Sequence, residues 1–424
     1  MGWPVVAIAR LSRGVLARGR AGGRSALLLG AVLPLFFSAG SASAVQTVWL
    51  DFITDQDVGE HVYTAAEQTS IRDTITADFS DFDFSFTLTA PGSGDYSTLT
   101  FNSDFITGGL ADAVDFRNLD QTDNAIINVN DLLGGFGNPA ATSANFVSMT
   151  STIGAHELGH LVGLRHLDSM GPIGLGISPT PGTGVFSPAY PGPTGADEAV
   201  AHIMASPVSV GSSLFDAAGD TFFSERSAIK LTFNESGSVL AEAGGAHDTL
   251  PTAQAITLSA LSVPNTIVVG DNAGKSFLVD AVVVTGTIGA FSEKDIYSFS
   301  GTVGDLMNFE VISAALDRIG NSIDSVISII DSGGSTVAYY TGLASNDDEF
   351  ETSDSMIIDL TLPATGTYYV QVNANGITDT GDYELFAHRF KLVPEPGTFG
   401  ILGLSLMAAL RMGRSPRRSR ARLR

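Results

Sequence analysis

Hydrophobic and polar residues alternate with different periods along this 424-residue chain. Strand-like alternation recurs in its first third, at residues 48–52, 84–89, 97–101 and 125–129. Apolar side chains at helical spacing fill three further segments, at residues 61–79, 145–164 and 221–233. Because strands and helices are interspersed in this order, residues 45–236 are predicted to form an α+β domain.

The pattern changes after residue 236. Residues 237–247 are rich in Gly, Ser and Ala, which predicts a linker. Short alternating segments then recur between Gly, Asp and Asn residues, at 277–285, 295–299, 306–312, 326–330, 336–340, 356–362, 366–372 and 383–388. This spacing is typical of an all-β sandwich, here over residues 248–390. Between the second and third predicted helices of the first domain, residues 169–194 are rich in Gly, Pro and Ser and predict a long irregular loop.

Both ends of the chain have the pattern of processing signals. An arginine-bearing start, an apolar run over residues 26–39 and the triplet Ala42-Ser43-Ala44 predict a secretory signal peptide over residues 1–44. An uncleaved membrane anchor is the alternative. At the other end, Pro394-Glu395-Pro396 precedes a short apolar run and an arginine-rich tail. A simple C-terminal membrane tail would have the same layout.

Residues 391–424 resemble the PEP-CTERM sorting signal of Gram-negative bacteria, in which the same three parts occur in the same order. The resemblance implies an exosortase-type processing enzyme as a partner and transient membrane attachment. Both terminal signals place residues 45–393 outside the inner membrane. We therefore expect an exported protein of the periplasm, the cell surface or the extracellular matrix.

Charge and cysteine content narrow the function classes. Residues 45–396 contain 10 basic and 45 acidic residues, a net charge of −35. Such a surface repels nucleic acid and anionic membranes, so no nucleic-acid partner is expected. The chain has no cysteine, which excludes disulfides and thiolate ligands. Any bound metal must be held by histidine and carboxylate side chains.

One segment combines these ligand types at a spacing that suits a metal. His156 and His160 are four residues apart, so they share one face of a helix, and Glu157 lies beside them. Gly163 favours the left-handed conformation that ends a helix, which allows His166 to return as a third ligand. Three imidazoles would leave one position of a Zn²⁺ ion for water, with Glu157 as general base. The alternative is a helix with buried, hydrogen-bonded histidines.

The full pattern HExxHxxGxxH resembles the metzincin clan of zinc metallopeptidases. The resemblance implies an α+β catalytic domain over residues 45–236, a strand that borders the substrate cleft, and a protein or peptide substrate. It also implies a methionine turn, which we assign to Met204. Ser206 stands where some relatives have a tyrosine ligand, so we expect three protein ligands. The subfamily stays open.

Acidic residues suggest calcium as a second ion. Residues 248–390 resemble the bacterial pre-peptidase C-terminal domain in the order of several short motifs, among them Lys294-Asp295-Ile296-Tyr297. Relatives of that domain bind calcium, so Asp295, Asp347 and Asp348 are candidate Ca²⁺ ligands, with metal-free β-turn aspartates as the alternative. A second acidic group precedes the motif helix, at Asp112, Asp115, Asp120, Asp123 and Asp131. Its spacing fits no calcium loop and favours a solvated acidic loop.

We therefore expect a secreted or surface-exported zinc-dependent endopeptidase with Glu157 as general base. Two alternatives stay open. One is a non-catalytic surface or matrix adhesion protein that keeps the zinc fold, which the intact Glu157 disfavours. The other is a hydrolase of non-peptide amides, for which the loop at residues 169–194 would restrict the cleft.

Overall fold

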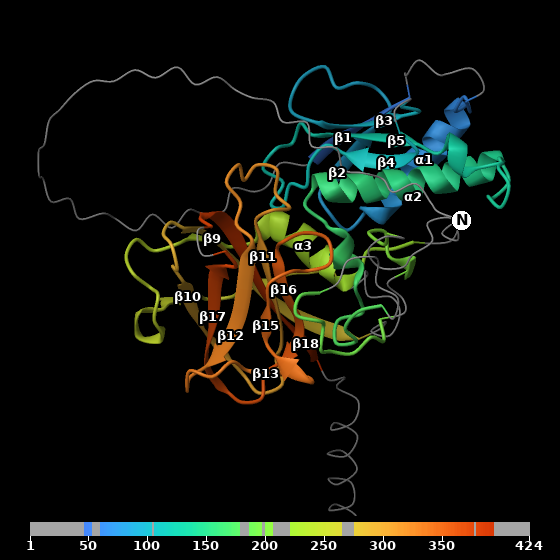
Figure 1. Cartoon of the computed structure of the whole chain (residues 1–424). Helices are drawn as coiled ribbons and strands as arrows, with labels where there is room; N and C mark the ends of the chain where they lie inside the picture. The colour runs from blue at the N-terminus through green and yellow to red at the C-terminus, as the bar shows by residue number, and fades with distance from the viewer. Residues whose placement is uncertain are drawn as a thin grey trace, which may run out of the picture. The chain divides into compact units, whose positions relative to one another are not determined.

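The first alternating segments of the chain form a five-stranded sheet in the computed structural model (Figure 1). The strands are β1 (Gln46–Asp51), β2 (Phe84–Thr87), β3 (Ser97–Phe101), β4 (Gly108–Ala111) and β5 (Asn124–Asn128). Their spatial order is β2-β1-β3-β5-β4, with β4 at an edge and antiparallel to β5, whereas the other pairs are parallel. The four predicted strands are confirmed. β4 was not predicted, because its sequence Gly-Gly-Leu-Ala has no alternation.

The structure describes residues 46–52, 60–103, 106–178, 186–196, 200–206, 221–264, 275–376 and 379–393. The predicted signal peptide and nearly all of the predicted sorting signal therefore lie outside the described residues. Within the described ranges, no helix is both long enough and apolar enough to cross a membrane.

Two helices pack together and against the core of this sheet: α1 (Ala65–Asp78) and α2 (Ser143–Leu161). Ile71 and Ile75 of α1 and Ile153 of α2 are buried with Leu50 and Leu99 of the strands. Each helix begins after a threonine, Thr64 or Thr142, whose side chain accepts a backbone hydrogen bond from the first turn. Short 3₁₀ helices follow β5 and α2, at η1 (Asn130–Leu132) and η2 (His166–Ser169).

The second half of the chain forms two sheets whose buried side chains share one hydrophobic core. One sheet has the order β15-β12-β17-β10-β7, and the other has the order β16-β11-β18-β9-β6, with β8 paired to β9. β13 and β14 form a separate hairpin. The strands are β6 (Val239–Ala241), β7 (Gln254–Ala255), β8 (Ser259–Leu261), β9 (Ser276–Ile288), β10 (Asp295–Gly301), β11 (Leu306–Ile312), β12 (Ser325–Asp331), β13 (Ala338–Tyr339), β14 (Gly342–Leu343), β15 (Ser345–Asn346), β16 (Ser355–Thr361), β17 (Gly366–Ala374) and β18 (Gly381–Val393), with η4 at Leu250–Thr252.

Each of the eight strand-like segments predicted here contains a strand, so a mainly β structure with a β-sandwich is confirmed. The predicted linker, however, contains β6, which pairs in parallel with β9. Because β6 is only three residues long, it is too short to show an alternation of polar and apolar residues in the sequence. Residues 237–247 therefore include one strand of the sandwich and are not a free connection.

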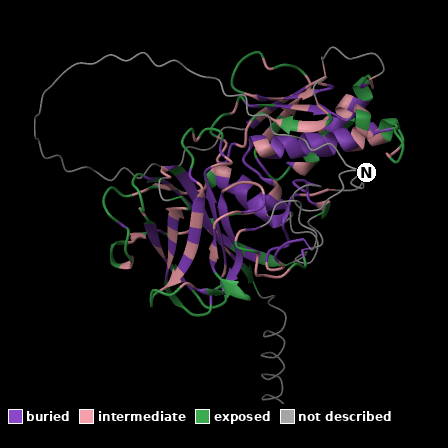
Figure 2. Cartoon of the chain, viewed as in Figure 1, coloured by how far each residue is buried: buried purple, intermediate pink, exposed green. Residues whose placement is uncertain are grey.

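The helix α3 (Glu225–Ser236) joins the two halves. Nine of its residues, Glu225 to Phe233, are buried, and Figure 2 shows it in the colour of buried residues along most of its length. Its Ile229 and Phe233 share a hydrophobic cluster with Val283 of β9 and Phe386 of β18. A helix that is buried on all sides lies in an interior, not on a surface. The sandwich therefore buries both faces of its β9–β18 sheet.

Candidate metal centre

The end of α2 determines where the third histidine lies. Gly163 has φ = +87°, as predicted, and a Cβ atom there would lie 2.2 Å from Phe116 Cα. The Gly163 N–H donates to the His160 carbonyl at 2.8 Å, and the Leu164 N–H donates to the Gly159 carbonyl at 2.8 Å. These two bonds form a Schellman motif, which ends the helix and reverses the chain. His166 then begins η2 and turns back toward the helix.

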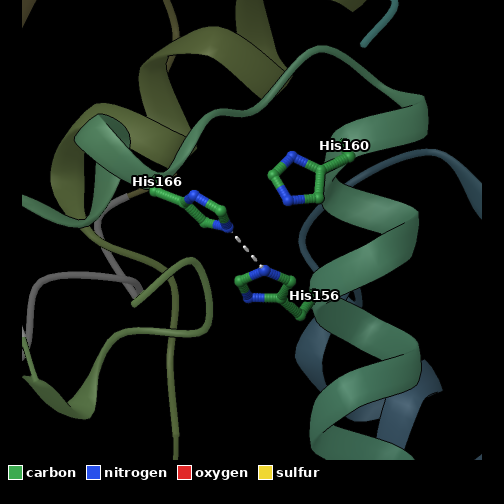
Figure 3. Close-up of side chains that lie close together, drawn as sticks. All are labelled: His156, His160 and His166. Atoms are coloured by element: carbon green, nitrogen blue, oxygen red, sulfur yellow. Dashed lines mark hydrogen bonds between the residues drawn. The ribbon is translucent and has the colours of Figure 1, made fainter. Parts of the chain in front are cut away.

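The three histidines converge, as Figure 3 shows. One ring nitrogen from each of His156, His160 and His166 lies within 4.8 Å of the other two. His156 and His160 project from the same helix, whereas His166 comes from the segment that follows it. His156 is buried, and the His166 side chain keeps 26% of its surface exposed, so the group is open to solvent on one side.

Hydrogen bonds at the Nδ1 atoms fix the tautomers. Nδ1 of His156 donates to the Ile203 carbonyl at 2.7 Å, and Nδ1 of His160 donates to the Leu164 carbonyl at 2.8 Å. Nδ1 of His166 donates to Oε1 of Glu351. In a neutral imidazole whose Nδ1 carries the proton, Nε2 keeps a bare lone pair. The three Nε2 atoms are therefore available as metal ligands.

The arrangement fits a zinc ion. Nε2 of His156 and Nε2 of His166 are 3.1 Å apart, and two bare lone pairs at this distance repel unless a cation or proton lies between them. Zn–N bonds of about 2.0–2.1 Å place two nitrogens of a tetrahedral site roughly 3.4 Å apart. Burial lowers the pKa of His156 well below its usual value and that of His160 to about 3, which keeps both rings neutral. Burial also acts to lower the pKa of His166, but the Glu351 carboxylate outweighs it and the pKa is raised.

Glu157 lies beside the histidines as a buried carboxyl group. Burial raises its pKa to about 7, against the opposing effects of nearby His166 and of a hydrogen bond from the Ala111 backbone. Its side chain occupies the space over Gly109 of β4, where a Cβ atom would lie 2.2 Å from Glu157 Oε1. Gly109 and Ala111 therefore place the edge strand β4 directly against this carboxyl group. No local pattern in the sequence predicts this contact.

Met204, which the resemblance assigns to a methionine turn, lies against α2. Met204 is fully buried. Gly159 lies between His156 and His160 on α2, and a Cβ atom built on it would lie 2.4 Å from the Met204 sulfur. The neighbouring Ile203 carbonyl accepts the hydrogen bond from His156. His202 is buried rather than exposed, and its Nδ1 donates to the Ser169 carbonyl at 2.5 Å. It therefore has a structural contact and is not among the converging ligands.

The sandwich contributes residues to this region that the sequence did not indicate. Arg165, which precedes the third histidine, is 3% exposed and donates to Glu310 of β11 at 3.1 Å and to Glu349 at 2.5 Å. Lys230 of α3 pairs with Glu310 and with Asp168, at 2.8 and 2.9 Å. Removing one partner of such a buried pair leaves an uncompensated charge, which costs about 3–5 kcal/mol. Asp168 accepts from Lys230 and from the Arg165 backbone N–H at the start of η2. Neither of these two hydrogen bonds joins it to a ligand histidine.

A second group of ligand atoms forms around Asp295, one of the candidate calcium residues. Nε2 of His247 lies 3.6 Å from both Glu242 Oε1 and Asp295 Oδ1, beyond hydrogen-bond range. Both His247 Nε2 and Asp295 Oδ1 are buried without a hydrogen-bond partner. The histidine makes the donor set more suitable for zinc than for calcium. Asp347 and Asp348 are not part of this group; instead, their charges act on Asp324.

The acidic segment before α2 is less solvated than we expected. Asp115 and Asp123 are buried, and Asp115 forms an ion pair with Arg318 of the sandwich at 2.7 Å. Asp120 instead accepts hydrogen bonds from Thr122. Burial and the neighbouring Asp120, Asp115 and Asp112 raise the pKa of Asp123 to about 7. Part of this segment therefore belongs to the interface with the sandwich.

Comparisons with known proteins give limited information. No protein-family model matches the chain, and no curated protein matches it. Among solved structures, the periplasmic lysozyme inhibitor PliG of Aeromonas hydrophila, an inhibitor of g-type lysozyme, is 11% identical, covers 36% of this chain and 97% of its own, and has a TM-score of 0.20. The pre-peptidase C-terminal domain of Bacillus anthracis collagenase is 15% identical, covers 25% of this chain and 86% of its own, and has a TM-score of 0.19. At these TM-scores neither similarity assigns a fold or a function to this chain.

Proposed function

We propose that this protein is an exported zinc-dependent endopeptidase with a metzincin-like α+β catalytic domain. One observation carries the proposal: three Nε2 atoms, each from a ring whose Nδ1 is bound to an acceptor, converge next to a buried carboxyl group. A site that only stabilised the fold would be closed by a fourth protein ligand, and Glu157 would have no role there. The alternative of a non-catalytic adhesion protein does not account for the Glu157 contacts.

Glu157 is the residue that moves protons in this proposal. Zinc bound to the three histidines would lower the pKa of a water molecule and polarise the scissile carbonyl. Glu157 accepts the proton from the attacking water and passes it to the leaving nitrogen. Glu157 is buried and directly follows His156 on α2, which keeps its carboxyl group next to the three histidines. The Ala111 backbone holds this carboxyl group in place.

The position of the edge strand β4 favours a peptide as the substrate. It ends the order of its sheet, so one side of its backbone is not paired with another strand of that sheet. An extended peptide can add to such an edge through main-chain hydrogen bonds. Because Gly109 and Ala111 of β4 contact Glu157, a peptide bound along β4 would pass next to the general base.

The roles proposed for the β-sandwich and the two ends of the chain are inferred from the sequence resemblances. In this proposal the β-sandwich is a pre-peptidase C-terminal domain, and the two terminal signals direct export, transient membrane attachment and cleavage by an exosortase-type enzyme. The substrate is a protein or peptide outside the inner membrane.

The test compares the purified full chain with its Glu157→Gln variant. We expect zinc-dependent cleavage of azocasein by the wild type, loss of cleavage on chelation and return of cleavage on adding Zn²⁺. Glu157→Gln should bind zinc as the wild type does and cleave about 100- to 10,000-fold more slowly, because proton transfer typically contributes 10²- to 10⁴-fold. Zinc binding without cleavage of a mixed peptide library by the wild type would refute the peptidase proposal. It would leave adhesion or a non-peptide amide as the function.

A further inference from the structure

His166 differs from the other two histidines in what orients its ring. His156 and His160 project from one helix, and their Nδ1 atoms donate to backbone carbonyls. His166 lies beyond the end of that helix, and its Nδ1 donates to a side chain 185 residues later in the chain, Glu351. The direction of its Nε2 lone pair therefore depends on a carboxylate from the sandwich half.

Glu351 is itself held by its neighbours. It lies between β15 and β16, where its backbone N–H donates to Glu349 Oε2 at 2.9 Å. The Thr352 N–H donates to Glu349 Oε1 at 2.6 Å, and the Glu349 N–H donates to the Asp354 carbonyl at 2.8 Å. Asp354 in turn accepts backbone hydrogen bonds from residues 313–315, which follow β11. This acidic turn, residues 349–354, is thereby fixed to the sandwich.

Arg165 joins the acidic turn to the metal centre. Its guanidinium group contacts Glu349 at 2.5 Å, Thr352 at 3.0 Å and Asp354 at 3.4 Å. Because Arg165 and His166 are adjacent in sequence, one docking contact aligns the arginine with the turn and the histidine with Glu351. The side chains of Arg165, Glu349 and Asp354 are at most 3% exposed, so the contact is an interior one.

We propose that Glu351 is a positioning residue of the metal centre, through which the β-sandwich orients the third ligand His166 and raises the affinity of the site for zinc. The inference rests on the proposed binding of zinc by His156, His160 and His166. A carboxylate that accepts from a ligand histidine fixes its tautomer and ring orientation, and loss of such a partner typically lowers metal affinity about 10- to 100-fold. In this proposal the sandwich contributes a side chain that supports the metal centre.

The experiment measures zinc affinity of the full chain by competition with a chromophoric chelator. We expect Glu351→Ala to bind zinc about 10- to 100-fold more weakly than the wild type, and Glu351→Gln, which keeps an oxygen acceptor without the charge, to lose less. Glu384→Ala is the matched control. Glu384 is a buried sandwich carboxylate that pairs across the same two halves with Arg117, and within the sandwich with Arg318, rather than with a histidine. It should lower the melting temperature without lowering zinc affinity.

Cobalt spectra separate ligand positioning from general destabilisation. The visible absorption bands of Co²⁺ bound to the site should shift in Glu351→Gln and stay as in the wild type in Glu384→Ala. Equal zinc affinity and equal cobalt spectra in Glu351→Gln and the wild type would refute the role of Glu351 while leaving zinc binding intact. A wild-type chain that binds no zinc would instead refute the proposed function. If Glu351→Ala does not fold, Glu351→Gln decides the question, since it nearly preserves size and shape.

Discussion

Replacing Gly163 by alanine tests whether the turn after α2 determines the position of His166. At φ = +87° an alanine costs about 1–2 kcal/mol, because its Cβ crowds the following carbonyl. The new Cβ would also lie 2.2 Å from Cα and 2.5 Å from the backbone nitrogen of Phe116. Backbone atoms cannot rotate away, so the turn must shift, which costs a further 1–3 kcal/mol or so. The expected loss is therefore about 2–5 kcal/mol of unfolding free energy.

Gly94→Ala is the matched control for this variant. Gly94 has nearly the same backbone angle, φ = +90°, but no atom lies within 4 Å of a Cβ built there. It should therefore lose only the conformational part, about 1–2 kcal/mol. Urea denaturation of both variants gives the difference, and chelator competition gives the zinc affinity. We expect Gly163→Ala alone to lose affinity, because the shifted turn moves His166. Equal stability losses in the two variants, or an unchanged zinc affinity in Gly163→Ala, would refute this reasoning.

Three further predictions concern residues around the site and the interface. Met204→Ala should destabilise the chain by about 2–5 kcal/mol, because it opens a cavity under the helical histidines. Met204→Leu should cost less than about 1.5 kcal/mol. Urea denaturation measures both losses, and equal losses would count against close packing around Met204. The pKa of Asp123 is raised to about 7, so the folded chain keeps this proton between pH 4 and 7 after the unfolded chain has lost it. Stability should fall as pH rises through this window, to which Glu157 and Asp78 also contribute because their pKa values are raised to about 7. Asp123→Asn should reduce that fall whereas the exposed Asp95→Asn should not, as urea midpoints at pH 5 and pH 8 would show. We also expect Glu242, His247 and Asp295 to bind a second zinc ion. His247→Ala should then reduce the zinc content of the chain by one ion in elemental analysis. An unchanged zinc content would exclude a metal ion at these three residues.

The parts of this structure that sequence could predict are those with a local pattern. The spacing from His156 to His166 encodes a helix face and its end, because four residues make about one turn and Gly163 permits the reversal. The longer sandwich strands were predictable because alternation extends over five or more residues and turn residues separate the segments. Those features depend only on neighbours along the chain.

The remaining parts depend on contacts between distant segments. β4 and β6 are short strands whose partners, not their sequences, make them strands. Glu351 is one of 45 acidic residues, and nothing around it in sequence distinguishes the one that contacts His166. Arg165 lies between two motif positions, and its neighbours in sequence do not indicate a buried ion pair. Its partners lie more than 140 residues away in the chain.

The separation of His166 from Glu351 also sets an order of assembly during synthesis. A ribosome that adds about 5–20 residues per second needs roughly 10–40 s to make the 185 residues between them. During that interval the chain has its three histidines but not Glu351, the carboxylate that we propose orients the last of them. A nascent chain would therefore compete poorly for zinc until the acidic turn is made and the sandwich has folded. The length of chain between two contacting side chains thus acts as a delay on maturation of the site.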